Sequence, residues 1–196
     1  MEKSVPQNCV TELAFEAALQ YNDPYNTIDL LVTFLPKVGP PIKVPGFWAG
    51  GKTFKVRFSS PEAGLYKYKT ECSMPGDAGL HNVEGLLEVT PYTGNNYLIK
   101  NGRIRVAQDR MHFEHHNGTP FFWLGDTWWM GMTSRLDFTV GFKQLVADRL
   151  AKGFNVIQLV AGPMPDMAYP DERNANEGGM PLSPDMETVN PAFFDY

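Results

Sequence analysis

The sequence predicts a mixed fold, with an antiparallel, immunoglobulin-like β-sandwich followed by the start of a parallel α/β domain. Apolar and polar residues alternate from residue 11 to about residue 90, which is typical of strands with one buried face. After residue 120, near-continuous apolar runs and one helical apolar stripe replace this alternation, and such runs indicate strands that are covered on both faces. With 196 residues, 43% of them hydrophobic and 20% charged, the chain suits a globular protein with a packed core.

The first half carries several short strand patterns. In the segment "TELAFEAAL", the apolar Leu13 and Phe15 alternate with the charged Glu12 and Glu16. The segments "TFKVRFSS" and "GLYKYKTE" show the same alternation. Turn residues such as those in "SPEAG" separate the strands, and this spacing predicts an antiparallel sandwich. The polar stretch "VTPYTGNNYLIKNGRI" then suits a linker. We therefore expect a sandwich domain over residues 1–105 and a second domain over residues 106–196.

The second half begins with a hairpin signal at Asn117-Gly118 and continues as strand, helix and strand. "PFFWLG" and "FNVIQLVA" read as buried strands, and the intervening segment places an apolar stripe on a helix at Phe142, Leu145, Val146 and Leu150. Such a unit joins parallel neighbouring strands. An irregular segment over residues 162–188 and a short helix start in "NPAFFDY" follow.

Charge and composition argue against several classes of partner. The net charge of -5, with no clustered Lys/Arg run, gives no reason to expect nucleic acid or an anionic membrane. Cys9 and Cys72 have no metal-ligand spacing, and His115-His116 lack a third ligand, so no metal site is expected. No nucleotide or dinucleotide fingerprint occurs, so we expect no cofactor. Without an apolar leader segment, the sequence as given predicts a cytoplasmic protein, or a secreted or periplasmic one if a signal was trimmed.

The stretch "FFWLGDTWWMGM" supplies the first candidate site residues. Asp126 follows an apolar strand, so its carboxylate should lie at the mouth of the sheet, where it either accepts hydrogen bonds from sugar hydroxyls or caps the next turn through the N–H of Trp128 or Trp129. In an extended chain, these two tryptophans point in opposite directions. One should pack between strand and helix, and the other could stack on a sugar ring.

Two further candidates lie later in the chain. Gln158 interrupts an apolar strand, so its amide either pairs inside the fold or contacts a ligand. The long irregular segment holds five carboxylates of interest, although for each taken singly a solvated loop acid is the favoured interpretation: Asp166, Asp171, Glu172, Glu177 and Asp185. Glu177, flanked by Asn176 and Gly178-Gly179, ranks first among them as a binding residue.

Several of these segments resemble a known family. "NGTPFFWLGDTWW", "RLAKGFNVIQLVA" and "NPAFFDY" resemble the opening of the apiosidase-like glycoside hydrolase catalytic domain, a (β/α)8 barrel. The earlier "YNDPYNTIDLLVTF" and "VPGFWAGGKTFKVRFSSPEAGLYKYKT" resemble the β-sandwich domain often found just before such barrels, although Tyr66 stands where that pattern usually has Trp. The resemblance implies a glycosidase that acts on O-glycosidic bonds of complex glycans without a cofactor.

The same resemblance implies roles for particular residues. Asp126, Trp128 and the strand around Gln158 would form the pocket wall, and the catalytic carboxylate pair would lie on later strands, beyond Tyr196. A (β/α)8 barrel needs roughly 250 residues, so we expect only its first βα units in this chain. Two alternatives stay open. The chain could be a non-catalytic carbohydrate- or protein-binding sandwich protein, or another chain could complete the barrel.

Overall fold

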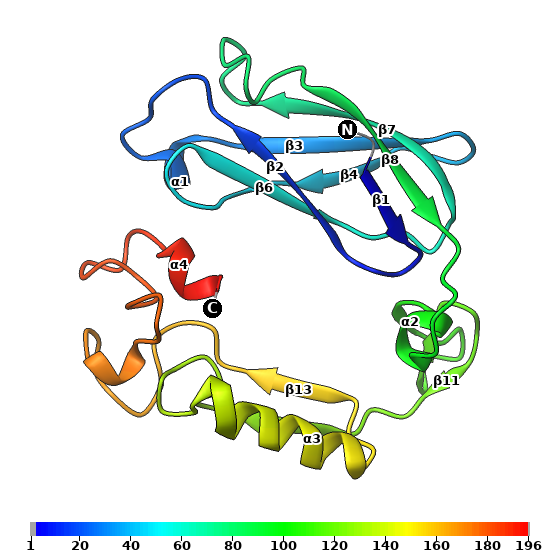
Figure 1. The fold of residues 1–196 in the computed structure, drawn as a ribbon, viewed down its shortest axis with the longest axis vertical. Coiled ribbons are helices and arrows are strands. Elements are labelled where there is room, and N and C mark those ends of the chain that lie inside the picture. The colour runs from blue at the N-terminus through cyan, green and yellow to red at the C-terminus, as the bar shows by residue number, and fades with distance from the viewer. Residues whose placement is uncertain (1–2, 196) are drawn as a thin grey trace. The chain divides into compact units, whose positions relative to one another are not determined.

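The computed structural model describes residues 3–195, which divide into two compact units, one ending at Phe121 and the other beginning at Phe122 (Figure 1). The first unit contains β1 (Lys3–Pro6), β2 (Thr11–Glu16), α1 (Pro24–Thr27), β3 (Leu30–Pro36), β4 (Ile42–Pro45), β5 (Phe47–Trp48), β6 (Thr53–Phe58), β7 (Gly64–Cys72), β8 (Glu84–Thr90), α2 (Tyr97–Asn101), β9 (Ile104–Val106), β10 (Phe113–His115) and β11 (Pro120–Phe121). The second contains β12 (Gly125–Trp128), the π-helical turn η1 (Phe138–Phe142), α3 (Lys143–Ala151), β13 (Val156–Leu159), the 3-10 turn η2 (Glu172–Asn174) and α4 (Pro191–Phe194).

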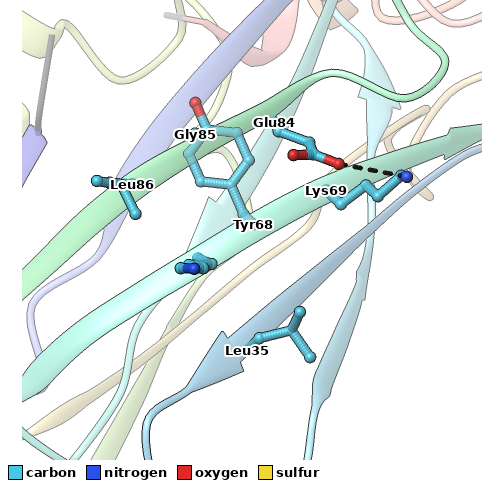
Figure 2. A pocket seen from close by; sticks show the side chains of 7 residues that line it. Leu35, Tyr68, Lys69, Glu84, Gly85 and Leu86 are labelled. Atoms are coloured by element: carbon cyan, nitrogen blue, oxygen red, sulfur yellow. Dashed lines mark ion pairs between the residues drawn. The ribbon is translucent and has the colours of Figure 1, made fainter.

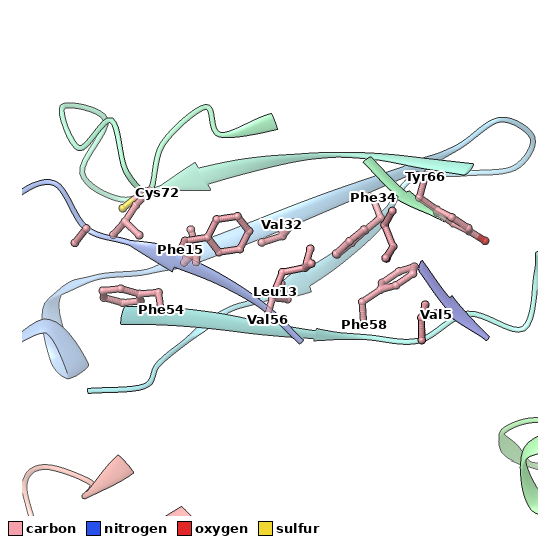
Figure 3. Packing of buried hydrophobic residues seen from close by; sticks show 14 of the residues in the cluster. Val5, Leu13, Phe15, Val32, Phe34, Phe54, Val56, Phe58, Tyr66 and Cys72 are labelled. Carbon is pink, nitrogen blue, oxygen red and sulfur yellow. The ribbon is translucent and has the colours of Figure 1, made fainter. Parts of the chain in front are cut away.

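Two sheets of the first unit share one hydrophobic core. The larger has the strand order β1-β8-β7-β3-β4 and the smaller has the order β2-β6-β5. The alternating residues of the sequence supply the core, since Leu13 and Phe15 of β2 are buried with Val32 and Phe34 of β3 (Figure 3). The rings of Phe34 and Phe58 stack with their centroids 3.9 Å apart. The inward-facing side chains of the two sheets therefore interdigitate in the core.

A buried carboxylate holds the long connection between β7 and β8. Asp77 is fully buried and accepts hydrogen bonds from the backbone N–H groups of Ala18, Leu19 and Gly79 and from the Tyr21 hydroxyl, at 2.8–3.1 Å. Burial alone would raise the pKa of Asp77, but these four donors together lower it below its ordinary value. The ionised Asp77 carboxylate therefore holds this connection together through its four hydrogen bonds.

A small three-stranded sheet, β11-β10-β9, completes the first unit. Its β10–β11 hairpin turns at Asn117-Gly118, where Gly118 has a φ of +86°, a value that favours glycine. This sheet lies in the unit that ends at Phe121, whereas the sequence places the hairpin in a second domain beginning at residue 106. The division at residues 105 and 106 stays a prediction.

The second unit corrects the predicted fold class. Strands β12 and β13 pair in parallel with α3 between them, but the sheet that they form has two strands, and a long irregular segment follows. The predicted barrel units were wrong. Within "PFFWLG" only Pro120–Phe121 (β11) and Gly125 (β12) lie in strands, "FNVIQLVA" gives the four-residue β13, and α3 contains no buried residue. Across residues 3–195 the protein is mostly β, with several small sheets and few short helices.

No helix in the described part of the chain is long and apolar enough to span a membrane.

Candidate functional site

The candidate site lies in the second unit, at the edge where β12 and β13 end. The register places Thr127 opposite Gln158 and Trp128 opposite Leu159, so both strands stop at the same edge. The segments that follow the two strands contact each other, because Ser134 donates its N–H to the Ala175 carbonyl at 2.9 Å. Both segments therefore build one surface, although they are distant in the sequence.

Asp126 lies on β12, and its carboxylate is fully engaged within the protein. Its Oδ1 accepts from the backbone N–H of Thr127 at 2.8 Å, and its Oδ2 accepts from the indole Nε1 of Trp128 at 3.0 Å and from Nε of Arg149 at 2.5 Å. The Arg149 hydrogen bond is the main reason why the pKa of Asp126 is lowered, and the Trp128 bond adds to it. Asp126 is thus an ionised group that ties its own strand to helix α3.

The two adjacent tryptophans have different surroundings. Trp128 is buried, and its ring meets that of Phe142 edge to face, with centroids 5.2 Å apart and an interplanar angle of 88°. Trp129 is 55% exposed. Trp128 therefore packs between β12 and the helical segment, whereas the face of Trp129 is open to a ligand.

Gln158 and Asn155, two amides near β13, differ in the same way. Asn155 accepts from the Leu124 N–H at 3.0 Å and donates to the Phe122 carbonyl at 2.7 Å, so it joins the starts of the two strands. Gln158 is exposed, and its side chain makes no hydrogen bond within the described residues. Of the two, only the Gln158 amide is open to solvent without a partner in the described chain.

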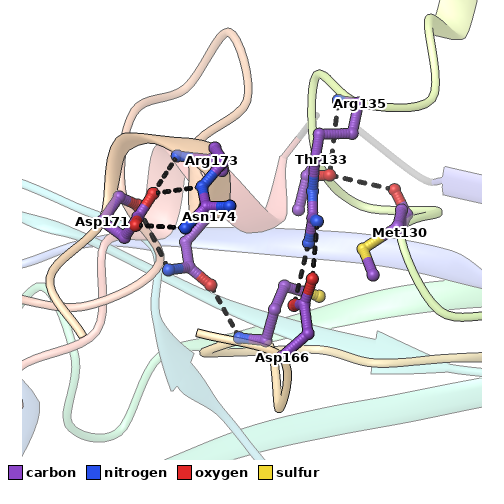
Figure 4. A network of polar contacts seen from close by, with 8 residues as sticks. Met130, Thr133, Arg135, Asp166, Asp171, Arg173 and Asn174 are labelled. Carbon is purple, nitrogen blue, oxygen red and sulfur yellow. Dashed lines mark hydrogen bonds and ion pairs between the residues drawn. The ribbon is translucent and has the colours of Figure 1, made fainter. Parts of the chain in front are cut away.

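Three of the five carboxylates singled out in the long segment have partners within the protein, and Figure 4 shows two of them, Asp166 and Asp171. Asp166 receives two hydrogen bonds from Arg135, at 2.8 and 3.2 Å, and these are the main cause of its lowered pKa. Asp171 is bound by Arg173, which lowers the pKa of this carboxyl to about 2. Asp185 accepts from the Ser183 hydroxyl and from the Glu187 N–H. These aspartates stabilise the segment and stay ionised.

Glu177 differs from these aspartates, because its exposed carboxylate has no partner among residues 3–195 while its neighbours are fixed. Asn176 is almost fully buried, and its amide donates to the carbonyls of Met132 and Phe193 at 3.1 and 3.0 Å. A Cβ on Gly178 would lie 2.1 Å from the Ala192 carbonyl oxygen, so only glycine fits there. The turn around Glu177 is therefore held against the segment that begins α4.

Sequence reasoning missed several residues that build this edge. Arg149 meets Asp126 across 23 positions, and Asn174 is fully buried, accepting from the Met164 N–H at 2.6 Å. The one available signal was an arginine near the end of the predicted helix, which reads equally well as a solvated charge. Within residues 3–195 no group of three or more His, Cys, Asp and Glu residues could hold a metal ion.

Comparison with known proteins places this edge in a family context. Residues 107–196 match the family model described as "Apiosidase-like, catalytic domain", and residues 4–73 match a domain of unknown function, DUF5060. None of the curated proteins compared with the chain matches it.

Among solved structures, the chain is similar to "a putative glycoside hydrolase from Bacteroides vulgatus ATCC 8482", with a TM-score of 0.72 and 22% identity. That match covers 99% of this chain and 37% of the other, so the chain spans little more than a third of that protein's length. A superoxide reductase (neelaredoxin) from Ignicoccus hospitalis gives a TM-score of 0.30 at 10% identity over 45% of this chain and 75% of the other, too low to carry an argument. Residues 107–196, which hold the candidate site, thus match the model of the apiosidase-like catalytic domain, and the chain shares its fold with part of the Bacteroides protein.

Proposed function

We propose that this chain is the glycan-binding N-terminal portion of a glycoside hydrolase that acts on O-glycosidic bonds of complex glycans. The observation that carries the proposal is that the segment matching the apiosidase-like family also holds three exposed side chains suited to a sugar. These are Trp129 just after β12, Gln158 on β13 and Glu177 in the following segment. The fold likeness to the Bacteroides structure, described as "a putative glycoside hydrolase", supports the same class.

Each of these side chains offers a different contact to a sugar. The exposed indole of Trp129 can stack on the apolar face of a pyranose ring. The Gln158 amide can donate to one hydroxyl and accept from another, and the Glu177 carboxylate can accept from two. A neutral, hydroxyl-rich ligand suits this combination, because it supplies both an apolar face and many hydrogen-bonding groups.

Asp126 acts in this proposal as a positioning residue. Its carboxylate already accepts three hydrogen bonds within the protein, so it orients Trp128 and the end of β12. Trp128 is buried beneath the edge, so in this proposal it supports the edge and does not stack on the sugar. Both residues thus shape the surface on which Trp129 is presented.

The general acid of a glycosidase needs a raised pKa, so that it carries a proton at working pH. Asp126, Asp166 and Asp171 all have lowered pKa values because arginines bind them. None of the three therefore suits the general acid, and arginines already occupy their oxygens, so we assign none of the three a catalytic role. The chain alone is expected to bind glycans without hydrolysing them.

Hydrolysis of a panel of aryl glycosides tests this proposal. The natural protein that contains these residues should release the aryl group from at least one glycoside, whereas the 196-residue chain should bind oligosaccharides and release none. Turnover by the chain alone would overturn the assignment of binding roles. Saturable glycan binding with no turnover by either protein would instead favour a non-catalytic carbohydrate-binding protein, an alternative that the arginine-paired aspartates also suit.

A further inference from the structure

The first unit carries a hollow of its own. It has a volume of about 330 Å³ and opens on the sheet formed by β3, β7 and β8 (Figure 2). Seven residues line it: Leu35, Lys67, Tyr68, Lys69, Glu84, Gly85 and Leu86. This volume falls at the lower end of the range for small-molecule sites, which is roughly 300–1,000 Å³.

The strand register arranges the lining of the hollow in two rows. Lys67 of β7 lies directly between Leu35 of β3 and Leu86 of β8. In the next row, Lys69 lies opposite Glu84, and the two side chains form an ion pair at 3.3 Å (Figure 2). In the first row, the Lys67 ammonium group therefore has an apolar side chain on each side. In the second row, the charges of Lys69 and Glu84 cancel.

Lys67 gives the hollow an unbalanced positive charge. Its ammonium has no hydrogen-bond or ion-pair partner in the part of the chain that the structure describes, whereas Lys69 is neutralised by Glu84. The chain as a whole carries a charge of -5, so this local excess of positive charge runs against the average. Lysines often protect exposed sheet edges from pairing, but β7 lies between β8 and β3, so that explanation does not apply to Lys67.

The floor of the hollow is held in place from the core. A Cβ on Gly85 would lie 2.3 Å from the Tyr68 hydroxyl oxygen, so a side chain there would displace the ring. The Tyr68 ring in turn contacts the rings of Phe15 and Phe34, at centroid distances of 6.1 and 5.9 Å. The backbone at Gly85 is thus fixed by core packing, so the floor of the hollow is rigid.

We propose that this hollow binds the carboxylate of an acidic sugar residue, a uronate, in a glycan. The Lys67 ammonium donates to the carboxylate, and one of the two leucines that flank it, Leu35 or Leu86, contacts the C–H face of the ring. One unpaired cation matches one carboxylate, which favours a single uronate over a run of closely spaced phosphates. The inference rests on the proposed glycan-directed function and extends it to the class of glycan that the first unit recognises.

Isothermal titration of the full chain with an oligogalacturonate and with its methyl ester tests the inference, since the ester keeps the ring and loses the charge. The acid should bind, more weakly as salt is raised, and the ester should not bind at this site. Lys67→Gln should weaken binding of the acid by roughly fivefold or more. Glu84→Gln should strengthen binding, because it releases Lys69 from its ion pair. Lys52→Gln, on an exposed turn before β6, is the matched control and should change nothing.

Equal binding of acid and ester, or equal effects of Lys67→Gln and Lys52→Gln, would overturn the inference. Binding of a DNA oligonucleotide with the same Lys67 dependence would also overturn it, because the hollow would then be a general anion-binding surface. These results are independent of the hydrolysis test. If the natural protein hydrolyses glycosides but the Lys67 effect is absent, only the uronate site fails. If Lys67-dependent binding occurs without any hydrolysis, the proposed enzyme function fails instead.

Discussion

Arg149 of helix α3 donates its Nε–H to Oδ2 of Asp126 on strand β12, across a distance of 2.5 Å. The same carboxylate oxygen accepts from the Trp128 indole at 3.0 Å, and the Arg149 guanidinium lies 5.4 Å from the centroid of the Phe154 ring. The pair therefore joins the strand, the helix and the start of the next strand. It accounts for the position of Trp128 beneath the candidate edge.

Replacing Arg149 by methionine should loosen this edge. The variant keeps most of the side-chain length but leaves the Asp126 carboxylate without its cation, so the melting temperature should fall and the fluorescence of Trp128 should shift to the red. Lys152→Met is the matched control, because Lys152, just after α3, pairs with Asp148 and not with Asp126. Equal melting curves and emission spectra for the two variants would show that the Arg149–Asp126 pair does not organise the edge.

The buried carboxylate of Asp77 should make stability depend on pH in the acid range. Its pKa is lower in the folded protein than in the unfolded chain, so its contribution is present above its ordinary value, near 4, and is lost as pH falls through the lowered folded value. Denaturant unfolding at several pH values should show this loss. Asp77→Asn should lower the free energy of unfolding at pH 7 by about 2–3 kcal/mol, since buried donors lose a charged acceptor.

Asp23→Asn is the control for Asp77→Asn, because the Asp23 side chain caps a surface helix. If Asp77→Asn had the same acid unfolding profile as the original chain, the claim that an ionised Asp77 stabilises this connection would be contradicted.

Tyr21, the hydroxyl donor to Asp77, should titrate late. Burial, and after it the hydrogen bond to Asp77, raises the pKa of Tyr21 to about 12. Because the folded value lies above the ordinary one, the contribution is present below pH 10 and is lost as pH rises toward 12. Ultraviolet titration of tyrosinate should lose its latest step in Tyr21→Phe. A late step that persists in that variant would assign it to another tyrosine.

Gly178 should tolerate no side chain. A Cβ there would lie 2.1 Å from the Ala192 carbonyl oxygen, so Gly178→Ala must push α4 away from the turn that presents Glu177. We expect a loss of about 2 kcal/mol or more in the free energy of unfolding. Gly76→Ala, where a Cβ meets nothing within 4 Å, is the control. If both alanine variants unfold at the same denaturant concentration, the turn is not held as described.

Local patterns predicted the core of the first unit but not the second unit. Alternation in "TELAFEAAL" correctly placed Leu13 and Phe15 inside, because a strand sends successive side chains to opposite faces. The helical stripe was misleading: Leu145 and Val146 are only partly buried and Leu150 is 67% exposed. An apolar stripe predicts that one face of a helix packs against other residues. It does not predict how many strands the adjoining sheet contains.

The candidate site was predictable in part. The sequence singled out Trp129, Gln158 and Glu177 from residue type and position, and their binding roles stay predictions. Arg149 could not be found in this way, because its link to Asp126 depends on how α3 lies along β12. The same holds for Asn174 and Asn176, whose buried amides are satisfied by backbone groups up to 44 positions away.

Calorimetric titration of the chain with neutral oligosaccharides tests the central claim most directly, when Trp129→Ala is compared with Phe122→Ala. Phe122 is 78% exposed and precedes β12, whereas Trp129 follows it, so the two variants remove exposed aromatic rings from opposite ends of one strand. The account predicts saturable binding that Trp129→Ala weakens roughly tenfold and Phe122→Ala leaves unchanged. Absence of binding by the original chain, or equal losses in both variants, would contradict it.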